Sequence, residues 1–318
     1  MAKSTMVCAG IDTGKRRLDV ALGGSDERLQ VDNGPAGHAR LSGWLRRHRV
    51  ERVGIEASGG YEGAVVAQLR RDGFVVILFQ PAQVRAYARF VLRRAKNDRL
   101  DAALIAACTA AANRIPAPAD PRLTALAGHL TMLDQLGQDI ACLKNRRESC
   151  RDPRIGQHWK AEIARLKAVR RAELKELAAA IRRHPDLAAR LDLLASIDGV
   201  GLPTAIAILV RLPEIGQLSR EQASALAGLA PYDDDSGERQ GRRHIAGGRE
   251  RLRHALYTAA FAAAFHWNDQ LKRCYRRLIL AGKPHKVALV ACARKLLIYA
   301  NTVVARGTPW CANPAGAP

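Results

Sequence analysis

Several motifs that mark well-known classes of protein are missing from this 318-residue sequence. Its seven cysteines are scattered, and no two of them have the C-x-x-C spacing of a zinc ribbon. Their odd number also argues against a disulfide scaffold and fits a reducing compartment. Neither the H-E-x-x-H motif nor the G-x-x-x-x-G-K-[ST] loop occurs, so zinc-protease and ATP-driven chemistry have no support.

Long apolar runs and aromatic residues are also scarce. No apolar run reaches the roughly 18 residues that a membrane-spanning helix needs, and the best candidates, residues 102–112 and 255–267, are short and rich in alanine. The first ten residues lack the apolar centre of a secretory signal. We therefore expect a cytoplasmic protein without a membrane partner. Because only 5% of the residues are aromatic, we expect phosphate contacts rather than a base-stacking platform.

Positive charge is what the sequence has in excess. There are 51 Lys and Arg against 30 Asp and Glu, a net charge of +21. The apolar fraction of 48% is ordinary for a folded protein, so the chain is not a disordered basic tail. A folded chain with this charge repels itself unless a polyanion binds, and the usual polyanions are nucleic acid or an anionic membrane surface.

Residues 1–115 predict an α/β domain. Short apolar segments at residues 7–12, 18–22, 29–31, 53–55 and 74–79 are expected to be strands. Residues 37–48, 61–71, 81–90 and 98–113 are expected to be helices. Hairpin-like strands followed by alternating helices and strands indicate a mixed sheet with helices on its faces.

Residues 116–190 predict a linker followed by long helices. Three prolines within residues 116–121 stop any helix. Apolar residues then recur at three- and four-residue steps on both sides of a break at Asp152-Pro153. This pattern predicts two amphipathic helices that pair or form an oligomerising coiled coil. Their outer faces are rich in Arg and Lys, which fits a solvated face and a polyanion contact equally well.

Residues 191–306 predict a third, mostly helical unit, and residues 307–318 a tail. Gly199 and Gly201 lie between two apolar helices, as in a helix-hairpin-helix motif that lets the backbone approach a phosphate. An ordinary helix–helix turn is the alternative. The end of this unit is the most basic part of the chain, and its candidate contacts to nucleic acid include Arg239, Arg242, Arg243, Arg249 and Arg253.

Four acidic residues occupy positions where a metal site is expected. Asp12 and Glu56 each end an apolar strand, and Asp98 and Asp101 lie three residues apart at a helix start, on one face. Oxygen ligands without Cys or His suit Mg²⁺, and four converging carboxylates meet the needs of a two-metal phosphodiester site. Alternatively, Asp98 caps the helix and Asp101 is a first-turn acid favoured by the helix dipole.

A polar loop at residues 228–243 contains Ser236 between an acidic triplet and three arginines. A nucleophilic serine needs activation by a base or by cations at the phosphate, and this loop contains both kinds of residue. From residue types alone, an ordinary turn is the better interpretation of Ser236-Gly237.

Together these blocks resemble the DEDD-type transposases of the insertion-sequence-110 family, described as bridge-RNA-guided recombinases. The resemblance spans about residues 5–305. It rests on Gly10-Ile11-Asp12 with Leu18-Asp19-Val20, on residues 54–59 and 96–102, and on residues 197–201, 228–237 and 252–256. One departure is Ala246-Gly247-Gly248, where a basic residue is expected before the glycine, so Arg249 is a candidate for that phosphate contact.

The resemblance implies both a fold and a reaction. It implies an RNase H-like (resolvase-like) N-terminal domain, a helical coiled-coil segment and a mostly α C-terminal transposase domain. By motif position, Asp12, Glu56, Asp98 and Asp101 would bind Mg²⁺, and Ser236 would be the nucleophile that joins DNA through a phosphoserine. A structured bridge RNA would pair with donor and target double-stranded DNA. The protein would act as a homo-oligomer, a dimer or a tetramer, at the nucleoid of a prokaryotic cell.

Two other classes stay open on the sequence. A metal-dependent junction resolvase or nuclease would use water as the nucleophile, with Ser236 as a turn residue. A non-catalytic nucleic-acid-binding protein would use the carboxylates only for structure. No sequence feature favours a small-molecule enzyme.

Overall fold

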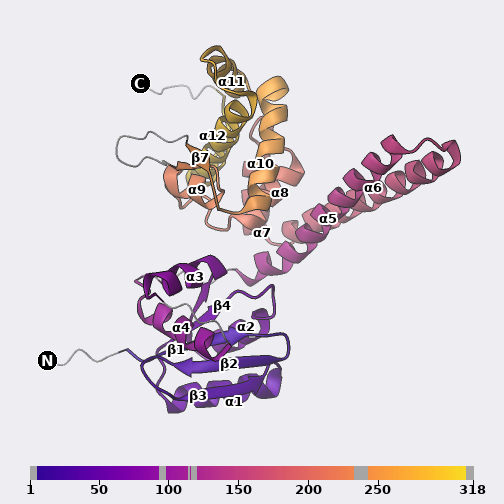
Figure 1. The fold of residues 1–318 in the computed structure, drawn as a ribbon. Helices are drawn as coiled ribbons and strands as arrows, with labels where there is room; N and C mark the ends of the chain where they lie inside the picture. Colours follow the sequence, from indigo (N-terminus) through magenta and orange to yellow (C-terminus); the bar gives the residue numbers. More distant parts are fainter. Residues whose placement is uncertain (1–5, 93–97, 114, 116–119, 233–242, 313–318) are drawn as a thin grey trace, which may run out of the picture. The chain divides into compact units, whose positions relative to one another are not determined.

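The computed structural model describes residues 6–92, 98–113, 115, 120–232 and 243–312, without the side chains of residues 98–100. The chain forms two compact units, Met1–Pro118 and Ala119–Pro318 (Figure 1). In the described residues, the first unit is α/β and the second is almost entirely helical, as the sequence predicts. The finer domain boundaries stay a prediction.

A five-stranded mixed sheet forms the centre of the first unit. Its strands are β1 (Cys8–Thr13), β2 (Arg17–Leu22), β3 (Arg28–Asp32), β4 (Arg52–Glu56) and β5 (Val75–Phe79). The spatial order is β3-β2-β1-β4-β5. The first three strands pair antiparallel, whereas β4 runs parallel to both β1 and β5. This mixed sheet fits the RNase H-like arrangement expected above.

Helices cover the two faces of this sheet. They are α1 (Pro35–Arg47), α2 (Gly63–Arg71), α3 (Pro81–Phe90) and α4 (Asp98–Ala110). Side chains of a strand alternate between faces, so Ile11 and Ile55 point into the core that contains Leu41 of α1 and Leu69 of α2. The alternate positions point toward α4, which therefore lies on the opposite face.

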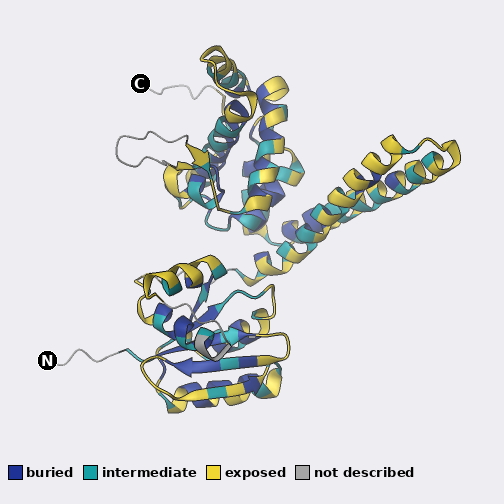
Figure 2. Cartoon of the chain, in the orientation of Figure 1, coloured by how far each residue is buried: buried dark blue, intermediate teal, exposed yellow. Residues whose placement is uncertain are grey.

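Two long helices, α5 (Pro121–Ser149) and α6 (Pro153–Arg182), begin the second unit. The Asp152 carboxylate accepts hydrogen bonds from the first backbone N–H groups of α6, which fixes the start of that helix at the expected break. The pair is antiparallel, because His129 meets Glu173 near one end and Ile140 packs with Ile163 toward the other. Figure 2 shows exposed residues along much of the pair. Coiled-coil assembly stays a prediction.

The rest of the second unit packs around one apolar core. Its helices are α7 (Pro185–Ala195), α8 (Leu202–Arg211), α9 (Arg220–Leu226), α10 (Glu250–Ala262), the π-helix η1 (Ala263–Trp267), α11 (Asp269–Leu280) and α12 (His285–Arg306). A short hairpin, β6 (Pro231–Tyr232) and β7 (His244–Ile245), lies between α9 and α10. The core includes residues from α5 to α12, among them Leu133, Leu177, Ile206 and Leu297.

Helix α12 bears on the expectation that no segment is long and apolar enough to span a membrane. By length and composition alone this helix could cross one. Its apolar run is interrupted by Arg294 and Lys295. Half of its apolar window is buried inside the second unit, and Leu289, Leu296 and Leu297 are fully buried there. Helix α12 is therefore a core helix of this unit.

Candidate functional site

Two glycines bring helix α4 directly onto the sheet. Gly10 of β1 and Gly54 of β4 lie side by side in the parallel register. A Cβ atom on Gly10 would overlap the backbone of Ala102 and Ala106, and one on Gly54 would overlap the Thr109 hydroxyl. Only glycine permits this approach, so α4 packs on β1 through its backbone and on β4 through the side chains of Thr109 and Ile105.

The direction of α4 decides which residues meet at the edge of the sheet. Ala102, in its first turns, lines a small pocket with Asp19 of β2, which pairs with Asp12. At the other end, the Arg52 guanidinium donates to the Ala112 carbonyl (3.3 Å), and Arg52 begins β4. Helix α4 therefore runs antiparallel to β1 and β4 and starts at their carboxyl ends.

Three of the four predicted carboxylates lie at this edge, on the α4 face. Asp12 and Glu56 follow the paired residues Ile11 and Ile55, two positions beyond the glycines that contact α4, so their side chains point to the same face. Asp101 belongs to the first turn of α4. All three are half-buried. Asp98 begins the helix, but its side chain lies outside the described residues.

The structure adds a carboxylate to this edge that the sequence motifs include but to which they assign no role. Asp19 of β2 lies directly opposite Asp12 in the antiparallel pair, so the two side chains share a face. The Asp19 carboxylate accepts a hydrogen bond from the Gln30 side chain (2.8 Å). The hairpin register could have indicated Asp19, because the turn after Thr13 sets which residue of β2 faces Asp12.

The donor set at this edge fits a hard divalent cation. It consists of carboxylate oxygens on half-buried side chains, which are the ligands that Mg²⁺ prefers. Among the described side chains, which exclude that of Asp98, no group of three or more His, Cys, Asp or Glu is already gathered as a metal site. The metal-binding roles of the four residues stay predictions.

A brace of hydrogen bonds through Asn33 joins the two loops that follow these strands. The Asn33 amide donates to the carbonyls of Gly14, after β1, and Tyr61, after β4, both at 3.0 Å. The ring nitrogen Nε2 of buried His38 lies 2.8 Å from the Asn33 carbonyl oxygen. That oxygen can only accept, so His38 donates. Burial lowers the pKa of His38, which favours the neutral ring.

The loop after Glu56 is further fixed by Glu62. Its carboxylate accepts hydrogen bonds from the backbone N–H groups of Ser58 (3.0 Å) and Gly60 (2.9 Å) and from the Ser58 hydroxyl. Burial raises the pKa of Glu62, but these hydrogen bonds outweigh it and leave the pKa below its ordinary value. Both loops beside the carboxylate edge are thus held by specific hydrogen bonds.

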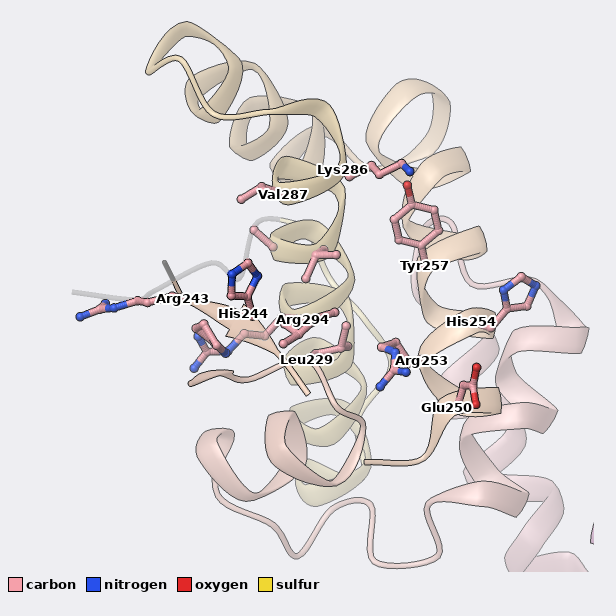
Figure 3. A pocket seen from close by; sticks show the side chains of 14 residues that line it. Leu229, Arg243, His244, Glu250, Arg253, His254, Tyr257, Lys286, Val287 and Arg294 are labelled. Carbon is pink, nitrogen blue, oxygen red and sulfur yellow. The ribbon is translucent and has the colours of Figure 1, made fainter. Parts of the chain in front are cut away.

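A cationic pocket of about 680 Å³ lies in the second unit beside the β6–β7 hairpin. Figure 3 shows Arg243 and His244 on one side and Arg253, His254 and Tyr257 of α10 on the other, with Lys286 and Arg294 from α12. Among the described residues of its lining, Glu250 is the single acid, and Ile245, Val287 and Val290 add apolar surface. The cations in this lining fit an anionic ligand such as a phosphate backbone.

The same hairpin closes the segment that contains Ser236. Pro231 pairs with Ile245 and Tyr232 with His244. Gly228 and Gly248, which flank the hairpin, pack backbone on backbone, and both have positive φ. A Cβ atom on either would overlap the segment that contains the other. Ser236, Arg239 and Arg242 lie outside the described residues. The structure thus fixes both ends of their segment next to the cationic pocket.

Two arginines predicted to contact nucleic acid have internal partners. Arg249 forms a bidentate ion pair with Glu214 (2.7 and 2.8 Å) and donates to the Arg211 carbonyl. The pair lowers the pKa of Glu214. Arg253 donates to the Gly247 carbonyl (2.6 Å) while lining the pocket. These contacts favour an internal role for Arg249, whereas Arg253 remains at the pocket wall.

The glycine turn between α7 and α8 has a packing reason. Gly199 has φ of +91°, and a Cβ atom there would overlap Ala263 of η1. Gly201 is the residue before α8 and has an ordinary negative φ of −75°. Two helices joined by a turn are therefore present at this position, whereas the helix-hairpin-helix motif and its contact with DNA stay predictions.

Comparison with known sequences identifies the family. A family model described as "Transposase" matches residues 9–150, and one described as "Transposase IS116/IS110/IS902 family" matches residues 191–276. The chain belongs to the IS110 family of transposases. The first match contains all four predicted carboxylates and the second contains Ser236 and Arg253. The resemblance drawn from the sequence motifs is thereby confirmed.

Full-length relatives and partial structural neighbours accompany these matches. The chain is 26% identical to the "Pilin gene-inverting protein" of Moraxella bovis and to that of Moraxella lacunata, over 95% of this chain and 96% of each relative. It also resembles Thermus thermophilus RuvC in complex with a Holliday junction substrate (23% identity, 32% of this chain, 91% of RuvC, TM-score 0.27). A second Thermus thermophilus RuvC structure matches 36% of this chain and 85% of its own at 25% identity and a TM-score of 0.23.

Family membership makes this chain a transposase, an enzyme that cleaves DNA. In the first unit of this transposase, Asp12, Glu56 and Asp101 lie at one edge of the sheet. In its second unit, the hairpin fixes both ends of the segment that contains Ser236, next to the cationic pocket.

Proposed function

We propose that this transposase exchanges DNA strands through a covalent phosphoserine at Ser236, directed by a bridge RNA that pairs with donor and target DNA. One observation carries the proposal: β1, β4 and the start of α4 bring their carboxylates to one edge of the first unit. The cationic pocket beside the Ser236 segment supports it.

Asp12, Glu56, Asp98 and Asp101 would hold the divalent metal ion, and Mg²⁺ is the ion that suits their oxygens. When bound, the ion supplies Lewis-acid polarisation of the scissile phosphate. The chain itself contributes rigidity, because α4 rests on Gly10 and Gly54 and the Asn33 brace fixes the following loops. Rigid carboxylates keep the reacting phosphate in place.

The chemical step exchanges one phosphodiester for another. The Ser236 hydroxyl oxygen attacks phosphorus, the bond from phosphorus to the DNA leaving oxygen breaks, and the serine proton ends on that oxygen. A hydroxyl of a second strand then attacks the phosphoserine, which restores Ser236 and joins the strands. No bond energy is lost, so the exchange needs no triphosphate.

Recognition in this proposal is divided between RNA and protein. Base pairing with the bridge RNA chooses the sequence, and the protein binds charge and shape. A net charge of +21 supports a protein that holds an RNA and two DNA duplexes. The carboxylates and Ser236 belong to different units, so they act together only if the units dock, within one copy or between copies of a dimer or tetramer.

The test is a suicide DNA substrate whose cleaved strand cannot be rejoined. Wild-type protein with Mg²⁺ should form an SDS-stable protein–DNA adduct, and Ser236→Ala should abolish it. Ser149→Ala, an exposed serine of α5 that bonds only to its own helix, is the matched control. Asp12→Asn should lower adduct formation at least about a hundredfold. Asp26→Asn, exposed in the turn between β2 and β3, should not.

An adduct that persists in Ser236→Ala contradicts the serine assignment. Cleavage without any adduct favours the water-using nuclease. Binding without cleavage, unchanged in Asp12→Asn, favours the non-catalytic protein.

A further inference from the structure

A connected group of rings lies at the surface where α10, η1, α11 and α12 meet. The ring centroid of Phe265 is 5.0 Å from that of Phe261, 4.9 Å from that of Tyr275 and 6.4 Å from that of His285. The Tyr275 hydroxyl lies 2.7 Å from His285 Nδ1, which fixes their orientation. These four residues are called the aromatic platform below. Phe261 is 50% exposed and Phe265 39% exposed.

The backbone beneath the platform is held by the core. Phe265 belongs to the π-helical turn Ala263–Trp267, and such turns occur frequently at functional sites. Its neighbours Ala263 and Ala264 are buried, and Ala263 packs directly on Gly199. The exposed rings are therefore presented by a fixed backbone, and a contiguous exposed apolar surface of this kind marks an interaction site.

Positive charge surrounds the platform. Residues 261–287 contain six Lys and Arg and one acid, Asp269, whose carboxylate is paired with Lys272 at 2.9 Å. On helix α11, Arg276 directly follows Tyr275, whereas Arg273 and Arg277 line a separate pocket with Lys295. The centres of protein–protein interfaces are depleted of charge. Rings interleaved with cations are instead the combination that binds single-stranded nucleic acid.

The platform is continuous with the cationic pocket. Tyr257 lies one helical turn before Phe261 on α10, and Lys286 follows His285 on α12. Both Tyr257 and Lys286 line the pocket and face it in Figure 3. A strand whose phosphates occupy the pocket can therefore continue onto the rings.

We propose that the aromatic platform stacks unpaired bases of a single-stranded RNA segment, whose phosphates contact Arg276 and Lys286. RNA is the favoured occupant because structured RNA presents unpaired bases in its loops, whereas the DNA of the proposed reaction enters as duplex. The inference rests on the RNA part of the proposed function and gives it a binding site. Aromatic residues are scarce in the sequence, but the fold brings three of them, Phe261, Phe265 and Tyr275, together at this surface.

The experiment compares the binding of three labelled probes to the full chain. The probes are oligo(U) and oligo(dT) of about 12 nucleotides, within the site sizes known for single strands, and duplex DNA. The variant Phe261→Ala/Phe265→Ala should bind oligo(U) about tenfold more weakly. Its affinity for duplex DNA and the salt dependence of oligo(U) binding should not change, because no charge is removed.

Three further variants serve as controls for this test. Phe90→Ala, an 82% exposed ring in the first unit, is the matched control and should bind oligo(U) as the wild type does. Phe261→Ala alone removes a half-exposed ring and should weaken oligo(U) binding severalfold if the double variant fails to fold. Asp12→Asn should bind oligo(U) normally, which separates RNA binding from the chemistry.

Several results would overturn the platform. Unchanged oligo(U) binding in the ring variants contradicts it. A loss of duplex DNA binding as large as the loss of oligo(U) binding also contradicts it. Loss of self-association with unchanged oligo(U) binding would make the rings a contact between copies. Stronger binding and a larger loss with oligo(dT) than with oligo(U) would make the occupant single-stranded DNA. A wild-type protein that binds no oligo(U) would contradict the RNA part of the proposed function, while the adduct assay would still test the chemistry.

Discussion

The two units of this transposase differ in the kinds of side chain that they present at their candidate sites. The first presents acidic side chains at the ends of buried strands, where α4 rests on Gly10 and Gly54. The second presents cations and rings on the outer faces of helices, around a pocket whose described lining contains a single acid. The contrast matches two tasks, since holding a metal and a phosphate needs rigidity, whereas covering a long polyanion needs exposed charge.

The strongest way to break this contrast is to separate α4 from the sheet. Gly10→Ala places a methyl group into the backbone of Ala102 and Ala106, and we expect the first unit to lose about 3 kcal/mol of stability. Gly43→Ala, in helix α1 with open space around its Cβ position, is the control and should not destabilise the unit. Thermal unfolding of both variants measures the difference. Equal stability would show that α4 does not need the glycine contacts.

A smaller change loosens the carboxylate edge without unfolding it. Asn33→Ala removes the hydrogen bonds to Gly14 and Tyr61 and the acceptor of His38. We expect adduct formation to fall about tenfold, the cost of leaving such groups unpaired, with oligo(U) binding unchanged. The exposed Asn113→Ala is the control. If oligo(U) binding falls together with adduct formation, the brace does not act on the first unit alone.

Acid should weaken the same brace. The pKa of His38 is lowered from its ordinary 6.5 by burial, so the unfolded chain takes up protons that the folded chain resists. Stability of the first unit is therefore complete above pH 6.5 and falls as the pH drops below it. Glu62 and Asp72 have pKa values below their ordinary values of 4.5 and 3.8. Their contributions to the stability of the first unit are therefore lost only when the pH falls below those ordinary values. His38→Gln should remove the loss that begins near pH 6.5 in denaturant unfolding, and a loss that persists excludes His38 as its source.

The smallest expected effect concerns the second unit. Arg249→Met breaks the ion pair with Glu214, which is only half-buried, so the unit should lose about 1 kcal/mol or less. The slope of DNA affinity against salt should stay the same, because Glu214 and the Arg211 carbonyl already engage the guanidinium. A slope reduced by about one would instead assign Arg249 to a phosphate.

Local patterns predicted most elements, because hydrophobic period and proline position fix them within a few residues. Helices α3, α5 and α6 begin at Pro81, Pro121 and Pro153. The grouping of Asp12, Glu56 and Asp101 was predicted from motif order, but the reason lies in the pairing of Gly10 with Gly54 beneath α4, which is a tertiary contact.

Features made by residues distant in sequence could not be predicted. Asn33 meets Gly14 and Tyr61 only after the sheet has formed, whereas the register of a short hairpin could have placed Asp19 opposite Asp12. The platform rings come from four helices, and only the fold brings them together. The buried role of α12 depends on neighbours that cover a helix interrupted by two cations.

The central claim is that chemistry in the first unit leaves DNA attached to a serine of the second. Mass spectrometry of the adduct, after DNA digestion and trypsin cleavage at Arg220 and Arg239, tests it most directly. The account predicts a nucleotide or phosphate mass on the peptide from Glu221 to Arg239, with the fragment ions assigning it to Ser236. A modification on Ser224 of the same peptide, or none on this peptide, would contradict it.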